Sequence, residues 1–235
     1  MRSEEYPSKE TAREKTEARA TAGLLALEMM HEIRNPLEAL NNLIYLRLEK
    51  ADEPETVRQY LRLAQEQTAA LGEISSYVLG FTRSSRLPKS TCLVALVEAA
   101  LRIHRKALER KTIHLVKDLP DGLSAEVHGG QILQVVSNLM ANALDALPID
   151  GTLCVRLRRR RSEAHFVIAD NGHGIPKSIF AHIFEPFFTT KDEVGTGLGL
   201  ALSKRIVEGH RGRIRVRSSL RPDKSGTIFK ISLPL

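Results

Sequence analysis

The sequence predicts an α+β protein: a helical hairpin, followed by a layered domain in which helices cover one side of a mixed sheet. Residues 8–50 and 55–82 carry apolar side chains at spacings of three and four, which is the period of amphipathic helices. From about residue 93 onward, helical stretches are interspersed with short β-like runs, as in a helix layer packed on a sheet. The 235 residues suffice for one large domain or two ordinary ones.

The hairpin is predicted from two helices and the turn between them. Asp52 and Pro54 lie where one helix should end and the next should start. Apolar and small side chains of the second helix alternate steps of four and three, which is the seam spacing of a helical bundle. They are Val57, Leu61, Ala64, Thr68, Leu71, Ser75 and Val78. Because a lone hairpin buries only one face of each helix, we expect a homodimer with a four-helix bundle.

The layered part is predicted to begin after residues 83–90, RSSRLPKS, whose serines and proline indicate a linker. Helices and strands are then expected in mixed order. The helices are expected at about 93–110, 131–147 and 198–208, and the strands at 113–117, 123–127, 152–158, 164–169, 213–218 and 227–233. The sequence contains no internal repeat and no low-complexity segment.

The composition argues against several classes of protein. Hydrophobic residues make up 42% and charged residues 27%, as in a globular protein with a buried core. No run of about 18 apolar residues is long enough to span a membrane, and the charged first twenty residues lack the apolar stretch of a signal peptide. Cys92 and Cys154 are too few for a disulfide framework or a zinc site, which favours a reducing, cytoplasmic setting.

The net charge of +7 raises the question of an acidic partner or nucleic acid. The densest basic segment is the arginine-rich run at residues 156–161. It has no interleaved aromatic residues to stack on bases, and the chain lacks the spacing of a helix-turn-helix or a zinc finger. We therefore interpret the run as a solvated strand end and expect no nucleic-acid partner.

The first helix contains an unfavourable residue close to a histidine. In MMHEIRNPLEALNNLIYL, residues 29–46, Pro36 lies within the apolar stripe, where it removes a backbone hydrogen bond at a cost of about 3 kcal/mol. His31 and Asn35 are four residues apart and share one helix face, and Glu32 is adjacent. Because the carbonyl of Glu32 loses its donor, we expect the helix to bend just after His31.

Glycine-rich segments and a polar helix face indicate a nucleotide site in the layered part. DNGHGIP follows an apolar strand at residue 170, and GTGLGLAL opens a helix at residue 195, where N–H groups attract phosphate. Neither segment matches the Walker loop or the dinucleotide fingerprint. Asn138, Asn142 and Asp145 share one face of the preceding helix. Asparagine oxygens suit Mg²⁺, although two asparagines at this spacing are equally compatible with a structural cap.

Five motifs, in order, resemble those of the sensor histidine kinases of two-component systems. HEIRNPLEA resembles their phospho-acceptor box, NLMANALDA their N box, DNGHGI their first glycine box, IFEPFFTTK their F box and GTGLGL their second glycine box. The resemblance covers about residues 22–235. DNA gyrase B, the mismatch-repair ATPases and the heat-shock chaperone share the ATP fold without the histidine hairpin.

The resemblance implies a domain organisation. Residues 22–84 would be a dimerisation and histidine phosphotransfer domain, residues 85–91 a linker, and residues 92–235 a catalytic ATP-binding domain. That domain would be an α/β two-layer sandwich of the GHKL ATPase, or Bergerat, type. Residues 1–21 resemble the tail of a linker helix, so the sensor region is either missing from the sequence or a separate protein.

The resemblance also implies a reaction in which ATP and Mg²⁺ phosphorylate His31. Glu32 would accept the imidazole Nδ1 proton, so that Nε2 attacks the γ-phosphate, and Asn35 would orient that phosphate. The phosphoryl group would pass to an aspartate of a response regulator, which the same protein would also dephosphorylate. Neutral histidine is nucleophilic near pH 7, which suits a temporary acceptor.

The implied ATP contacts lie in the other four motifs and in a GTIF segment. Asn142 would hold Mg²⁺, Asn138 and Asp145 would line the phosphate side, and Asp170 would bind the adenine amino group. The remaining positions are Gly172, Gly174, Ile175, Lys191, Gly195, Thr196, Gly197, Leu198, Gly199 and Thr227. Because few residues separate the two glycine boxes, we expect a compact ATP lid that is fully ordered only with nucleotide bound.

The predicted function is therefore an ATP-dependent protein-histidine kinase with response-regulator phosphatase activity. One alternative is a non-enzymatic scaffold that keeps the hairpin for dimerisation and partner binding. The presence of His31, Glu32, Asn142 and Asp170 argues against it. A second alternative, an ATPase or nucleic-acid-associated relative that uses the basic strand end, has no use for the box around His31.

Overall fold

The computed structural model describes residue 30 and residues 33–45, 54–79, 87–191 and 196–235. The chain divides into two compact units, Met1–Ser76 and Tyr77–Leu235. The first unit is helical in its described part, and the second combines a sheet with helices. The domain boundaries expected at residues 84 and 92 stay a prediction.

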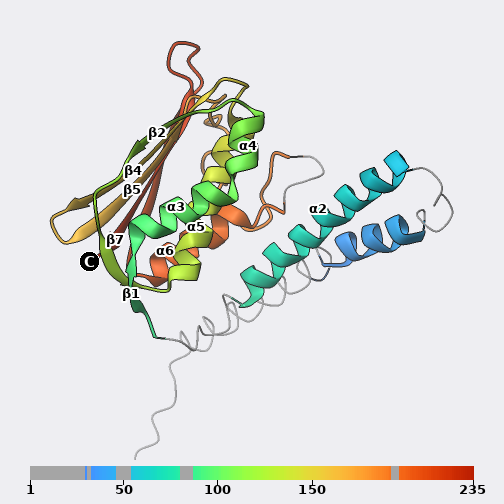
Figure 1. The fold of residues 1–235 in the computed structure, drawn as a ribbon, viewed down its shortest axis with the longest axis horizontal. Helices are drawn as coiled ribbons and strands as arrows, with labels where there is room; N and C mark the ends of the chain where they lie inside the picture. Colours follow the sequence, from blue (N-terminus) through green and yellow to red (C-terminus); the bar gives the residue numbers. More distant parts are fainter. Residues whose placement is uncertain (1–29, 31–32, 46–53, 80–86, 192–195) are drawn as a thin grey trace, which may run out of the picture. The chain divides into compact units, whose positions relative to one another are not determined.

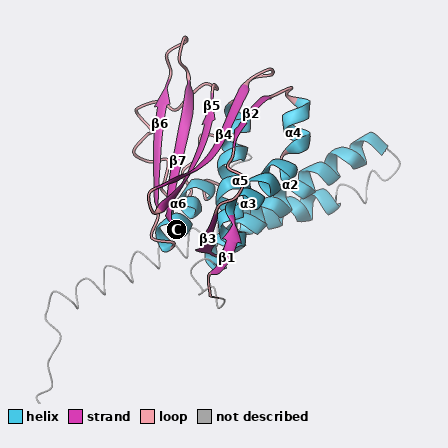
Figure 2. Ribbon diagram, turned by 60° about the vertical axis from the view of Figure 1, so that its left-hand side comes forward, coloured by secondary structure: helices cyan, strands magenta, loops and turns pink. Residues whose placement is uncertain are grey.

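The first unit contains two helices that lie side by side, residues 33–45 and α2 (Pro54–Leu79) (Figures 1 and 2). The prediction of a helix at 8–50 is confirmed over residues 33–45, and the rest of that range lies outside the described residues. The helical backbone continues through the buried Pro36. The carbonyl of Glu32 lies outside the described residues, so a bend just after His31 stays a prediction.

Large apolar side chains of the hairpin remain exposed within one chain. Leu37 and Ile44 of the first helix are 51% and 58% exposed, and Leu61 of the α2 seam is 48% exposed. Isolated exposed apolar residues are normal on protein surfaces, but these recur along the predicted bundle seam and stripe. The hairpin alone therefore leaves part of its apolar surface in contact with water.

A five-stranded mixed sheet forms one layer of the second unit. Its strand order is β2-β4-β5-β7-β6, and only the β2–β4 pair is parallel. The strands are β2 (His114–Asp118), β4 (Thr152–Arg160), β5 (Glu163–Asp170), β6 (Arg213–Ser219) and β7 (Gly226–Pro234). Figures 1 and 2 show helices on one side of this sheet, so the predicted two-layer α/β sandwich is confirmed.

The second layer consists of helices that precede or connect the strands. They are α3 (Leu93–Ile103), α4 (Arg105–Arg110), α5 (Gly129–Ala146) and α6 (Gly199–Gly209). Helix α5 lies at the centre of this layer, packed between α3 and α6 and against β5. Its fully buried residues Val136, Leu139 and Met140 form part of the core.

The period of two in the strands explains which face of the sheet is covered. Leu153, Val155 and Leu157 of β4 are buried, whereas Arg156 and Arg158 between and after them are exposed. Successive side chains of a strand point to opposite faces, so one face meets the helices and the other meets water. The arginine-rich run is thus a solvated strand end, as predicted, and Arg158 pairs with Asp118.

The structure differs from the sequence-based expectation at two places. Strand β1 (Lys89–Cys92) pairs with β3 (Ser124–Val127), so the linker predicted over residues 85–91 overlaps with a strand of the second unit. The helix predicted over 93–110 is interrupted at His104, which joins α3 and α4. No helix in the described part of the chain is long and apolar enough to cross a membrane.

Candidate nucleotide site

The polar face of α5 forms one wall of the candidate site. Asn138 donates a hydrogen bond from Nδ2 to Oγ of Ser203, at 2.9 Å, and so joins α5 to α6. Gly199, the first residue of α6, lies so close that a Cβ atom there would be 2.5 Å from Asn138 Oδ1. Asn142 is half-buried and Asp145 is exposed one turn further along the same face. The expected clustering of these three residues on one face of a helix is present.

Asp170, the last residue of β5, lies at the end of the sheet. Its Oδ1 accepts hydrogen bonds from the backbone N–H groups of Gly172, at 2.9 Å, and Thr227, at 3.2 Å. These bonds fix the carboxylate between the first glycine box and strand β7. Asp170 and Thr227, both implied ATP contacts, are directly opposite each other in the β5–β7 pair.

The environment of Asp170 raises its pKa above the ordinary value of 3.8. Burial of the carboxyl group is the main cause, because it disfavours the charged form. The hydrogen bonds from the backbones of Gly172 and Thr227 oppose this effect, as does the nearby His173. The carboxyl group therefore binds a proton more readily than an exposed aspartate does.

The glycine boxes adopt backbone conformations and close approaches that other residues would disturb. Gly174 has a φ of +76°, and a Cβ atom on it would lie 2.3 Å from the carbonyl oxygen of Ser219. Gly197 has a φ of +65°, and its Cβ atom would lie 2.3 Å from the backbone of Phe187. Left-handed φ values cost glycine little, whereas residues that carry a Cβ atom adopt them rarely. The two glycine boxes thus bring the chain after β5 and the chain before α6 close to neighbouring backbone.

The F box meets the N box through an ion pair. Lys191 Nζ contacts Asp145 Oδ2, and both side chains are about half exposed. The backbone N–H of Leu198 points to Thr196 Oγ1 at 3.4 Å, and Leu198 itself is fully buried at the start of α6. Gly195 lies outside the described residues. Of the predicted lid positions, Lys191 and Gly199 thus contact the α5 face, and Gly197 lies against the F box.

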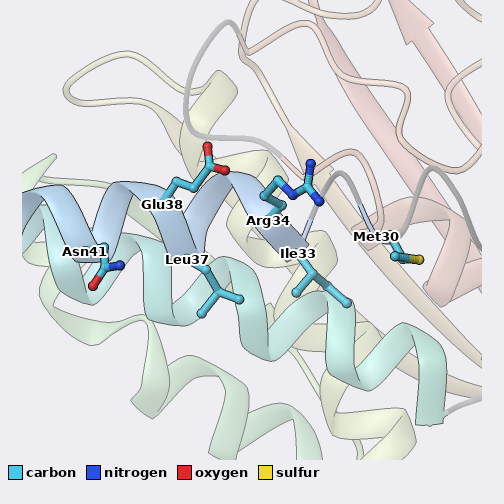
Figure 3. A pocket seen from close by; sticks show the side chains of 6 residues that line it. All are labelled: Met30, Ile33, Arg34, Leu37, Glu38 and Asn41. Carbon is cyan, nitrogen blue, oxygen red and sulfur yellow. The ribbon is translucent and has the colours of Figure 1, made fainter.

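The phosphotransfer helix carries the other half of the predicted chemistry. His31 and Glu32 lie outside the described residues, and Asn35 is exposed on the helix that follows them. A shallow pocket on this helix is lined by six residues, shown as sticks in Figure 3. They are Met30, Ile33, Arg34, Leu37, Glu38 and Asn41. A mixed apolar and polar surface thus begins within one turn of the predicted phospho-acceptor.

Two side chains that shape the site were not predicted from the sequence. Ser203 of α6 binds Asn138, and Ser218 of β6 accepts the backbone N–H of Ile175 at 2.7 Å. A signal for Ser218 exists in the sequence, because the alternating pattern RIRVRS places a serine where an inward-facing apolar residue is expected. The bond explains how Ile175, a predicted cofactor position, is tied to the edge strand.

The polar side chains of the site fit a purine nucleotide with its metal ion. A buried acceptor at one end of the site, Asp170, and oxygen-bearing side chains along α5 suit a base at one end and a metal-bound phosphate at the other. Among the described residues, no group of three or more His, Cys, Asp or Glu side chains is placed to hold a metal ion. Mg²⁺ also accepts amide and phosphate oxygens, and the side chain of Asn142 carries an amide oxygen.

The fold and the site together define an ATPase domain of the GHKL class. Residues 128–235 match the sequence model of the histidine kinase-, DNA gyrase B- and HSP90-like ATPases. Within that class, the relatives found along the full length of the chain are histidine kinases. Residues 128–235 thus belong to this ATPase class, and the relatives that align along nearly the whole chain are sensor histidine kinases.

Three known proteins show the extent of the similarity. The signal transduction histidine-protein kinase AtoS of Escherichia coli is 33% identical over 97% of this chain and 37% of its own length. Sporulation kinase A of Bacillus subtilis is 31% identical over 94% of this chain and 36% of its own length. The solved structure of the histidine kinase ThkA in complex with the response regulator protein TrrA superposes with a TM-score of 0.72 at 25% identity, over 96% of this chain and 65% of that one. The chain thus spans little more than a third of the length of the two curated relatives.

Proposed function

We propose that this chain is the kinase core of a two-component system: it transfers the γ-phosphoryl group of ATP to its own His31. The observation that carries the proposal is a candidate nucleotide site in a GHKL ATPase domain. The chain that contains this domain aligns with AtoS over 97% of the chain's own length. The ATPase domain alone would serve a gyrase or a chaperone equally well. The helical hairpin with the box around His31 supplies the acceptor that those proteins lack.

At the nucleotide end, side chains of this chain bind ATP and orient it. Asp170 accepts the adenine amino group, and Asn142 holds Mg²⁺ next to the phosphates with Asn138 and Asp145 beside it. ATP supplies the phosphoryl group, and Mg²⁺ neutralises charge on it. Charge neutralisation is a main requirement of a loose phosphoryl-transfer transition state. Lys191, which pairs with Asp145 in the structure, contacts phosphate when ATP binds, and residues 195–199 form the lid.

At the acceptor end, His31 provides the nucleophile. Glu32 accepts the Nδ1 proton, which leaves Nε2 of the ring with a lone pair for the phosphorus. Asn35 orients the γ-phosphate and, in the separate phosphatase reaction, orients a water molecule that hydrolyses the partner's aspartyl phosphate. The phosphorus–nitrogen bond of the product is reactive enough to pass the group to an aspartate.

We further propose that the partner is the receiver domain of a response regulator and that the chain acts as a homodimer. ThkA, its structural relative, was solved in complex with a response regulator. The pocket around Leu37 and Asn41 in Figure 3 lies directly after His31 and suits a protein surface that must reach the same histidine. The exposed apolar side chains of Leu61 and Ile44 suit burial by a second hairpin. ATP-driven transfer of this kind belongs in the cytoplasm.

Incubation with γ-labelled ATP and Mg²⁺ tests the proposal. Wild type should acquire acid-labile, alkali-stable label, as a phosphohistidine does. His31→Gln should abolish the label and leave nucleotide affinity unchanged, because the acceptor alone is removed. Asn142→Ala should abolish the label through lost Mg·ATP binding, whereas Gln131→Ala, near the other end of α5, should retain it. Label retained in His31→Gln would show that another residue is the acceptor.

A further inference from the structure

Three neighbouring strands place polar residues in a single row on the helix-covered face of the sheet. Asp170 of β5 is directly opposite Thr227 of β7, and Thr227 is directly opposite Ser218 of β6. The next row along the same strands is apolar and consists of Ile168, Phe229 and Val216. The polar row therefore ends the core at the point where the nucleotide site begins.

The hydroxyl group of Ser218 has three neighbours and only one proton. It accepts the backbone N–H of Ile175 at 2.7 Å and donates to the carbonyl oxygen of Gly226 at 2.8 Å. Its third neighbour is Oγ1 of Thr227, at 3.0 Å. A serine hydroxyl has one donor and two acceptor sites, so its second lone pair must accept the proton of Thr227. Ser218 thereby determines the direction of the Thr227 hydroxyl.

This arrangement leaves only acceptors at the base end of the site. Thr227 is 96% buried and, having donated to Ser218, can offer a ligand only its lone pairs. Oδ1 of Asp170 is already occupied by two backbone N–H groups. Oδ2 accepts no hydrogen bond from any of the described residues and is an acceptor as well, when the carboxyl group is ionised.

We propose that Ser218 is a positioning residue for base selection: by accepting the Thr227 proton it makes this end of the site a pair of acceptors, which admits a 6-amino purine and rejects a 6-oxo purine. The proposal rests on the nucleotide site proposed above and adds the residue that sets its selectivity. A 6-amino group donates to both acceptors. A 6-oxo group presents an oxygen to them and leaves buried acceptors without a partner, which is unfavourable.

Replacement of Ser218 by alanine should release the Thr227 proton. The threonine hydroxyl could then rotate and donate to a 6-oxo group, so binding of the 6-oxo purine should improve relative to the 6-amino purine. A purely structural role of Ser218 predicts a different result. Loss of its bonds to Ile175 and Gly226 would loosen the site and weaken both nucleotides to the same extent.

Equilibrium binding of ADP and IDP to the full chain separates the two roles, because IDP carries an oxygen in place of the 6-amino group. The ratio of the IDP and ADP dissociation constants should fall roughly fivefold or more in Ser218→Ala. In the Thr227→Val background, the same Ser218→Ala change should leave the ratio unaltered, because there is no hydroxyl left to release. Ser219→Ala, at the neighbouring position of β6, is the matched control and should keep the wild-type ratio.

An unchanged ratio in folded Ser218→Ala, or an equal change in the presence and absence of the Thr227 hydroxyl, would overturn the proposal. If Ser218→Ala does not fold, Ser218→Cys retains the size of the side chain with a weaker acceptor and should shift the ratio in the same direction. A folded Ser218→Cys with the wild-type ratio would equally refute it. Wild type that binds neither nucleotide would instead overturn the nucleotide site itself.

Discussion

The chemistry of the candidate site depends at the residue scale on one carboxyl group. Asp170 ends β5, is largely buried, and is held by the backbone of Gly172 and Thr227. Burial raises its pKa, whereas the two N–H donors stabilise the charged form. The carboxylate is thus positioned as an acceptor, but the buried carboxyl group also binds a proton more strongly than an exposed aspartate does.

We predict that ADP affinity falls as the pH is lowered, and that the decline starts at higher pH than an ordinary aspartate would cause. The proposed adenine contact requires the ionised carboxylate, and the pKa of that carboxyl group in the free protein is raised. Calorimetric titration with ADP across a pH series measures the effect. Asp170→Asn should bind ADP about tenfold or more weakly at neutral pH and lose this pH dependence. A pH profile identical in both proteins would show that another group is responsible.

Gly172 gives a second prediction at this scale, because it is packed against the end of α5. A Cβ atom on Gly172 would lie 2.4 Å from the carbonyl oxygen of Ala146. Gly172→Ala should therefore displace the first glycine box, lower the free energy of unfolding by about 1–3 kcal/mol and weaken ADP binding. Urea denaturation and ADP titration measure both effects. Gly122→Ala, where no atom lies within 4 Å of the added methyl group, should leave both unchanged.

At the scale of elements, the end of α5 is stabilised by a residue from another helix. Lys111, which follows α4, donates from Nζ to the carbonyl oxygens of Leu144 and Leu147, at 2.6 and 2.8 Å. The last carbonyls of a helix have no partner within it, and a cation there also interacts favourably with the helix dipole. Lys111 thus fixes the end of the helix that carries Asn138, Asn142 and Asp145.

We predict that Lys111→Met lowers the free energy of unfolding by about 1–3 kcal/mol, because it leaves two carbonyl groups without their donor. The methionine retains most of the side-chain volume, so the loss reports the hydrogen bonds. Urea denaturation followed by circular dichroism measures it. Lys106→Met, on the exposed side of α4, should have little effect. Equal destabilisation by both changes would mean that the cap contributes nothing specific.

At the scale of the whole molecule, two histidines couple the helices of the second unit. His104, between α3 and α4, has Nε2 at 2.8 Å from Ser137 Oγ of α5. His210, after α6, donates from Nδ1 to the carbonyl of Ile206 and accepts the backbone N–H of His128 at Nε2. Burial lowers the pKa of both rings, and His128 further lowers that of His210. A proton on Nε2 of His210 would replace an acceptor by a donor facing an N–H group.

We predict that the second unit loses stability as the pH falls below the ordinary histidine pKa of 6.5. Both folded-state pKa values are lowered, so the unfolded chain binds protons first; the stability is fully present above pH 6.5 and declines as the pH drops toward the folded-state values. Urea denaturation between about pH 8 and pH 5 measures the free energy of unfolding. His210→Gln should flatten the curve, and His182→Gln, an exposed site, should not. A steeper decline in His210→Gln would contradict the assignment.

The helices, the strands and the class of chemistry were predictable from the sequence, because each depends on local sequence patterns. The period of two in β4 and the period of 3.6 in α5 follow from which side chains the core must bury. The glycines of 172–174 and 197–199 and the polar face at Asn138 and Asn142 are likewise contiguous or one turn apart. Helix–strand boundaries were therefore recovered to within about two residues for most of the second unit.

What only the tertiary structure decided are the contacts between residues far apart in the chain. Strand register brings Asp170, Thr227 and Ser218 into one row, and no local pattern specifies which strands pair. His104, at the break between α3 and α4, likewise contacts Ser137, and β1 pairs with β3, in each case across more than thirty residues. Local periodicity indicates which face of an element is buried. It does not indicate which residues that face packs against. In this protein, the direction of the Thr227 proton depends on the neighbouring strand that supplies Ser218.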